Sequence, residues 1–139
     1  MFNKILLASD GSEHAMRATE KAITLADKNL NAIITILYVV NMNKSKNDVL
    51  HSWNSADLDR SRREELALTE QKIKHAHIKY EMEILHGEPG PTIVNYINEN
   101  EVDICVIGSR GLNSLQEMVL GSVSHKVAKR ANCPVMIVK

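Results

Sequence analysis

The stretch that decides the fold is Val106-Ile-Gly-Ser-Arg-Gly-Leu-Asn-Ser-Leu-Gln-Glu-Met-Val-Leu-Gly-Ser-Val-Ser-His125. It begins at the end of an apolar run and passes through three glycines, Gly108, Gly111 and Gly121, before Ser122 opens a helical pattern. Glycines let a backbone come close to a ligand. A helix N-terminus offers unpaired N–H groups and a partial positive charge to an anion. The stretch therefore predicts a strand, a phosphate-binding loop and a helix, which together favour a nucleotide site.

The rest of the chain alternates between strand and helix patterns. Apolar runs predict strands at 4–9, 32–40, 78–85, 102–107 and 135–138. Helical spacing predicts helices at 15–26, 57–75, 92–99 and 122–131, and the polar segment 41–56 is expected to be irregular. This alternation predicts an α/β fold with one doubly wound, Rossmann-like, five-stranded parallel sheet and helices on both faces.

Length, charge and cysteine content limit the classes of protein to consider. The 139 residues favour a single domain, 1–139, and the 17 Lys and Arg residues balance the 17 Asp and Glu residues, which argues against a general nucleic-acid binder. No apolar run is long enough to span a bilayer or to form a signal peptide. Cys105 and Cys133 match no zinc spacing and are expected to be free thiols, so we expect a cytoplasmic protein.

In open parallel sheets, ligands bind beyond the carboxyl ends of the strands, where the strand order reverses. The first predicted strand ends in Ala8-Ser9-Asp10. Asp10 is a candidate to accept hydrogen bonds from ribose hydroxyls or to hold a divalent cation, and the alternative is a plain helix N-cap. Val39, at the end of the second strand, is a candidate to offer main-chain N–H and C=O groups to an adenine edge.

The glycines supply the phosphate side of this candidate site. Gly108 and Gly111 would wrap the phosphates, while Gly121 and Ser122 would donate N–H and O–H groups from a helix N-terminus. The alternative for each is an ordinary turn glycine or simple helix initiation, and only their joint placement after the strands favours an anion site. The chain lacks both the P-loop motif and the Gly-x-Gly-x-x-Gly fingerprint, which excludes P-loop proteins and disfavours dinucleotide dehydrogenases.

The glycine spacing resembles the ATP-binding signature of the universal stress protein family, Gly-x2-Gly-x9-Gly-Ser/Thr. The resemblance covers the whole chain. Its other matching stretches are Ile5-Leu-Leu-Ala-Ser-Asp-Gly-Ser12, His86-Gly-Glu-Pro89, Val102-Asp-Ile-Cys-Val-Ile-Gly-Ser-Arg-Gly111, Leu120-Gly-Ser-Val-Ser-His125 and Cys133-Pro-Val-Met-Ile-Val-Lys139.

The resemblance implies a strand order of 3-2-1-4-5, ATP bound with Mg²⁺ or Mn²⁺, and homodimers built through the last strand. Asp10 would then meet the ribose or the metal ion, and Val39 the adenine, while the glycine-rich residues would meet the ribose and the phosphates. The complete implied site consists of Ala8, Ser9, Asp10, Val39, Ile107, Gly108, Ser109, Arg110, Gly111, Gly121, Ser122 and Val123.

The leading functional hypothesis is an ATP-binding stress-response protein that senses or signals nucleotide state with little or no turnover. Phosphoryl transfer needs a positioned base or water-orienting residue and cationic clamps on the phosphates, and the loop carries no lysine and no obvious base, so no catalytic residue is predicted. One alternative is a slow ATPase or phosphotransferase that uses Ser122, Asp10 and a metal ion. Another is an interaction module without nucleotide, against which the intact glycine pattern argues.

Overall fold

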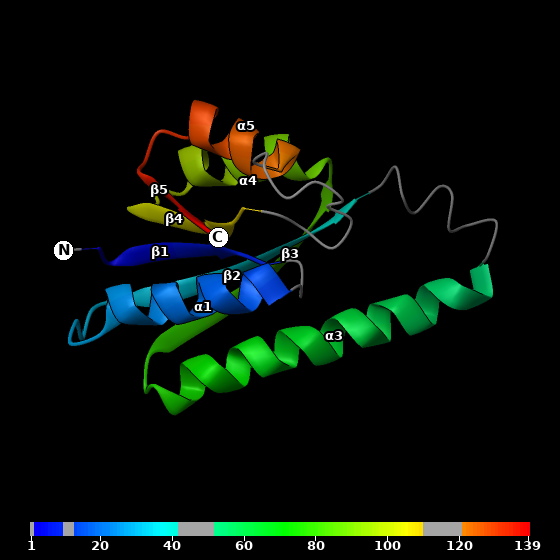
Figure 1. Ribbon diagram of the computed structural model, residues 1–139, viewed down its shortest axis with the longest axis horizontal. Helices are drawn as coiled ribbons and strands as arrows, with labels where there is room; N and C mark the ends of the chain where they lie inside the picture. The colour runs from blue at the N-terminus through cyan, green and yellow to red at the C-terminus, as the bar shows by residue number, and fades with distance from the viewer. Residues whose placement is uncertain (1, 10–12, 42–51, 110–120) are drawn as a thin grey trace.

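The computed structural model describes residues 2–9, 13–41, 52–109 and 121–139. Its elements are β1 (Lys4–Ala8), α1 (Glu13–Ala26), β2 (Ile33–Asn41), α3 (Ser52–His75), β3 (Lys79–Gly87), α4 (Pro89–Glu99), β4 (Ile104–Gly108), α5 (Ser122–Arg130) and β5 (Val135–Val138). The strands pair in parallel in the order β3-β2-β1-β4-β5. Helices α1 and α3 cover one face of the sheet, and α4 and α5 cover the other (Figure 1). The predicted fold class and strand order are therefore confirmed.

One core cluster lies between the sheet and the helices α1 and α3. From α1 it takes a stripe of small side chains, Ala18, Ala22 and Ala26, which are at most 2% exposed. They pack against strand residues such as Ile5 and Ile34. Because alanine adds little bulk, this face of the helix packs closely on the sheet.

A second core cluster lies between the sheet and the helices α4 and α5. Leu6 and Leu37 enter it from the strands, Ile93 and Ile97 from α4, and Val127 from α5. Successive strand side chains point to opposite faces, so β1 feeds both clusters, with Leu6 on this side and its neighbours on the other. Each fully buried side chain of this size contributes roughly 1.5–3 kcal/mol relative to an exposed one.

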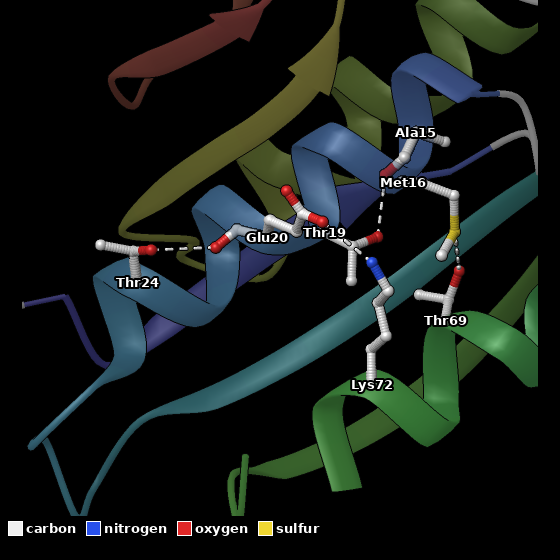
Figure 2. Close-up of polar contacts among 7 residues, drawn as sticks. All are labelled: Ala15, Met16, Thr19, Glu20, Thr24, Thr69 and Lys72. Atoms are coloured by element: carbon white, nitrogen blue, oxygen red, sulfur yellow. Dashed lines mark hydrogen bonds and ion pairs between the residues drawn. The ribbon is translucent and has the colours of Figure 1, made fainter. Parts of the chain in front are cut away.

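Helix α3 packs against α1 through a narrow and partly polar contact (Figure 2). Thr19 and Thr69 are fully buried, and the Thr69 hydroxyl donates to the Met16 sulfur at 3.7 Å. At the surface, Lys72 Nζ lies 2.9 Å from Glu20 Oε1, and this hydrogen bond and charge hold the pKa of the Glu20 carboxyl below its usual value. The contact therefore relies on a few specific pairs in addition to apolar burial.

Three helices begin earlier than the sequence pattern predicted, and α1 does so by only two residues, at Glu13. Helix α3 begins at Ser52 rather than residue 57, because a helix nucleated by its packed half can propagate through residues without apolar spacing. Helix α4 begins at Pro89 rather than residue 92. A proline fits the first helical position because its missing N–H has no partner there, so the Pro and Gly residues at 89–91 form the first helical turn.

Candidate functional site

The strand order reverses at β1 and β4, which lie side by side with Ala8 opposite Ile107. From β1, the chain passes to β2 and β3 on one side, and β4 and β5 fill the other. Beyond this pair the two chain segments turn apart. The Ser9 N–H donates to the Leu37 carbonyl of β2 at 3.0 Å, whereas the Ser109 N–H donates to the Val138 carbonyl of β5 at 2.8 Å. The carboxyl edge therefore opens between Ser9 and Ser109, at the kind of position where open parallel sheets bind ligands.

Strand β2 forms a wall beside this opening, because it extends past the end of β1. Ala8, the last residue of β1, lies opposite Leu37, and β2 continues to Asn41 in register with β3. The Leu37 carbonyl points toward β1, where it accepts the Ser9 N–H. In a parallel ladder, alternate residues point their main-chain groups to the same side, so Val39 directs its N–H and C=O toward the opening.

The N-terminus of α5 lies on the other side, held to the end of β4. The Gly121 N–H donates to the Ser109 carbonyl at 2.7 Å, so the N-terminus of α5 is bonded to the residue that follows β4. The Ser124 hydroxyl, which is buried, lies 3.0 Å from the Gly121 carbonyl and 3.4 Å from the Ser109 carbonyl. This small network fixes where α5 begins relative to the sheet.

The first helical bond of α5 runs from the His125 N–H to the Gly121 carbonyl at 3.0 Å. The N–H groups of Ser122, Val123 and Ser124 precede that bond and have no earlier carbonyl within the helix to accept them. Such a helix end attracts an anion through these N–H groups and through the helix dipole. The sequence predicted that the Gly121 N–H would donate to a phosphate, but in the structure it donates to the Ser109 carbonyl.

The other site residues named from the sequence fall into three groups. Ala8, Val39, Ile107 and Val123 all pack into or against the core cluster under α4 and α5. Gly108 is half-buried at the end of β4, Ser9 and Ser109 are buried, and Ser122 is exposed. The structure therefore brings these residues to one edge of the sheet. The remaining three, Asp10, Arg110 and Gly111, lie outside the described residues.

The structure adds two groups that sequence reasoning did not name, the Leu37 carbonyl and the Ser124 hydroxyl. A serine three residues after a helix N-cap can bond back to the cap carbonyl, which is a signal that the sequence contained. The Leu37 carbonyl could not be found in this way, because its role follows from the register of β1 against β2.

No group of three or more His, Cys, Asp or Glu side chains that could hold a metal ion occurs among the described residues. The two cysteines are free, with Cys105 buried and Cys133 half-buried, and burial raises the pKa of both thiols. Within the described ranges, no helix combines the length and the apolarity that a membrane span requires.

A model of the universal stress protein family matches residues 1–139. The chain belongs to the universal stress protein family. Its relative universal stress protein YxiE of Bacillus subtilis is 37% identical over 149 residues, and the match covers 100% of both chains. The solved structure of MJ0577, a universal stress protein of Methanocaldococcus jannaschii, has a TM-score of 0.89 at 27% identity and covers 100% of this chain and 96% of its own.

Two further solved structures of the family contain a nucleotide. One is a universal stress protein in complex with cAMP, with a TM-score of 0.71, 24% identity and coverage of 99% of this chain and 97% of its own. The other is a protein from Arabidopsis thaliana with AMP bound, with a TM-score of 0.68, 23% identity and coverage of 99% and 91%. At these identities the likeness establishes a shared fold.

Proposed function

We propose that this protein binds ATP, together with Mg²⁺ or Mn²⁺, at the carboxyl edge between β1 and β4, and that it signals or senses nucleotide state with little or no turnover. The observation that carries the proposal is the bond from the Gly121 N–H to the Ser109 carbonyl at 2.7 Å. It holds the N-terminus of α5 beside the edge at which the strand order reverses. A helix N-terminus in that position is suited to phosphate groups.

The same geometry supports an assignment for each part of the nucleotide. The main-chain groups of Val39 would meet the adenine, and the N–H groups at Ser122 and Val123 would meet the phosphates. Gly108 and Gly111 would allow the chain to pass close to the phosphates, with Arg110 beside them. Asp10 would meet the ribose hydroxyls or a metal ion that also binds the phosphates.

Two family members of this fold hold an adenine nucleotide, cAMP in one and AMP in the other. They support a nucleotide rather than another anion, since the fold accommodates one in those proteins. Because those two ligands are cAMP and AMP, the affinity of this protein for ATP must be compared with its affinity for AMP and for cAMP. Titration of nucleotide-free protein with each of the three, with and without Mg²⁺, measures the preference directly.

The main alternative is a slow ATPase or phosphotransferase that uses Ser122, Asp10 and a metal ion. Without a positioned base, we expect turnover far below the typical enzyme value of about 10 per second. The identity of any nucleotide that remains bound to the purified protein distinguishes these functions. Bound ATP supports binding without turnover, bound ADP or AMP supports hydrolysis, and protein that neither carries nor takes up nucleotide supports an interaction module. Phosphate release at about one per second that Asp10→Ala abolishes would establish an enzyme.

We also propose that the protein forms a homodimer through β5. This strand is at the edge of the sheet, and its residues Val135, Met136 and Ile137 are only partly buried. An apolar edge strand tends to pair with another chain unless charge, a bulge or a covering segment protects it. A second copy related by a two-fold axis is the most common partner for such a strand. The cytoplasmic location expected from the sequence stays a prediction.

A further inference from the structure

A cavity lies at the opposite edge of the sheet from the candidate nucleotide site. It has a volume of about 100 Å³. The amino-terminal parts of β1, β2 and β3 line it, and so do the end of α4 and the turn that follows. Its apolar walls include Leu6, Ile33 and Val102, and its polar groups include Lys4, Thr35 and Glu81.

The uncovered wall of this cavity is unexpected from the sequence. A continuous apolar run such as 32–40 is typical of a strand buried on both faces, yet Ile33 is 39% exposed. Ile33 lies on the side of the sheet that α4 covers, in the row between Lys4 of β1 and Lys79 of β3. Helix α4 covers this row of residues only in part, so the Ile33 side chain faces the cavity.

Opposite charges flank this apolar wall on different strands. Lys4 Nζ donates to the Asn100 carbonyl at 3.3 Å, which leaves two ammonium hydrogens for another acceptor. Glu81 Oε1 accepts the Thr35 hydroxyl at 3.0 Å, which leaves the second carboxylate oxygen. Within the described part of the chain, neither Lys4 nor Glu81 takes part in an ion pair. Strands β1 and β3 are two spacings apart, about 10 Å, with Ile33 and Thr35 between them.

Tyr96 of α4 completes the acidic end of the cavity. Burial raises the pKa of its phenol, and the nearby carboxylates of Glu83 and Glu81 raise it further. The phenol therefore lies in a region of negative potential and keeps its proton. Its oxygen can accept a hydrogen bond from a cationic group that approaches Glu81.

We propose that this cavity binds a small zwitterion, an amino acid with a short methylene chain. Its carboxylate lies on Lys4, its ammonium group lies on Glu81 and Tyr96, and its methylenes cover Ile33 and Val102. A volume of about 100 Å³ corresponds to about three waters, which matches a ligand of roughly five to seven heavy atoms. Two charge-assisted contacts on so small a ligand predict a dissociation constant in the millimolar range.

NMR titration of the full chain with 4-aminobutyrate tests this site, and n-butylamine and butyrate provide the two halves of the ligand. We expect 4-aminobutyrate to shift the amide signals of residues such as Ile33 and Glu81 and to saturate. Each half should bind at least about tenfold more weakly, because each lacks one charged contact. Equal binding by either half, or no saturation by 4-aminobutyrate at tens of millimolar, would overturn the proposal.

A test variant and a matched control show whether the ligand binds at Glu81. Glu81→Gln removes the negative charge and should weaken 4-aminobutyrate binding at least about tenfold, while butyrate binding stays unchanged. The matched control is Glu70→Gln, which alters a carboxylate that accepts the Tyr80 hydroxyl at 3.0 Å on the other face of the sheet, and it should leave binding unchanged. If Glu81→Gln does not fold, Thr35→Val removes the hydroxyl that orients Glu81 and should also weaken binding. Full affinity for 4-aminobutyrate in Glu81→Gln, or in Thr35→Val, would reject this site.

Discussion

The Gly121 amide donates to the Ser109 carbonyl at 2.7 Å, so the first residue before α5 is bonded to the residue just after β4. Eleven residues of the sequence separate the two. The bond also sets the direction in which the unpaired N–H groups of α5 face. The position of this helix end thus depends on a main-chain contact that any residue except proline could make, while the proposed close approach of a phosphate would depend on glycine.

Gly121→Val should abolish ATP binding, whereas Ser122→Ala should only weaken it. Gly121 has ordinary backbone torsions, φ −58° and ψ 149°, so valine fits the conformation and the effect reports steric blocking of the phosphates. Ser122→Ala keeps the N–H and the helix end, so roughly 1–2 kcal/mol of affinity should be lost. Calorimetric titration of the folded variants measures both. Wild-type affinity in Gly121→Val would remove the phosphate role of α5.

Gly87→Ala should destabilise the fold, by roughly 1–3 kcal/mol. Gly87 has φ +151°, which L side chains rarely adopt, and an added Cβ would lie 2.7 Å from the Thr92 hydroxyl oxygen. The matched control is Gly90→Ala in the first turn of α4. Its Cβ would meet only the flexible Lys126 side chain at 3.0 Å, and alanine favours the helix by about 0.5–1 kcal/mol. Urea denaturation compares the two, and equal stability of Gly87→Ala and wild type would contradict the strain.

Asp103→Asn should reduce stability near neutral pH and have less effect in acid. The Asp103 carboxylate accepts the N–H groups of Lys4 at 2.9 Å and Asn3 at 3.0 Å, and these bonds hold its pKa below the usual value. Because the folded-state pKa lies below the unfolded value of about 3.9, the stabilisation is present above about pH 4. It is lost as pH falls through the folded-state pKa.

At this exposed position the contribution of Asp103 should be about 1 kcal/mol or less. Urea denaturation of wild type and Asp103→Asn at several pH values measures the difference in unfolding free energy. The difference should shrink as the pH falls below about 4. A difference that stays constant from neutral to strongly acidic pH would show that the charge of Asp103 plays no part.

The proposed dimer predicts that Ile137→Lys or Val135→Pro yields monomers. A lysine would place charge in the pairing surface, and a proline would remove a donor from the edge strand. Light scattering at tens of micromolar protein reports the assembly. A monomeric wild-type protein would reject the dimer, and a dimer that persists in both variants would place the interface elsewhere.

Most of the sheet could be predicted from the sequence because its strands are short apolar runs between turn signals. The alanine stripe of α1 is also a pattern that favours close packing on a sheet, and Ala18 and Ala22 are fully buried. The predicted start of α4 was wrong because proline and glycine, which occupy positions 89 and 90, are common in turns. The packing of Ile93 and Ile97 against the sheet favours a helix there, and the local sequence does not show that packing.

The candidate site was only partly predictable, since several of its features come from strand register. The glycine spacing pointed to the carboxyl edge, but the overhang of Val39 beyond Ala8 follows from the pairing of Ala8 with Leu37. The engagement of the Gly121 N–H by Ser109 likewise joins two residues whose approach depends on where α5 packs. Local patterns carry no information about such distant contacts.

The central claim is that the edge between β1 and β4 binds ATP, and thermal unfolding of nucleotide-stripped protein tests it most directly. With MgATP at about 100 times its dissociation constant, the wild-type protein should gain about 2.7 kcal/mol, which is several degrees in melting temperature. Gly121→Val should unfold at the same temperature with and without MgATP. An unchanged melting temperature of the wild-type protein at millimolar MgATP, or an equal rise in Gly121→Val, would contradict the claim.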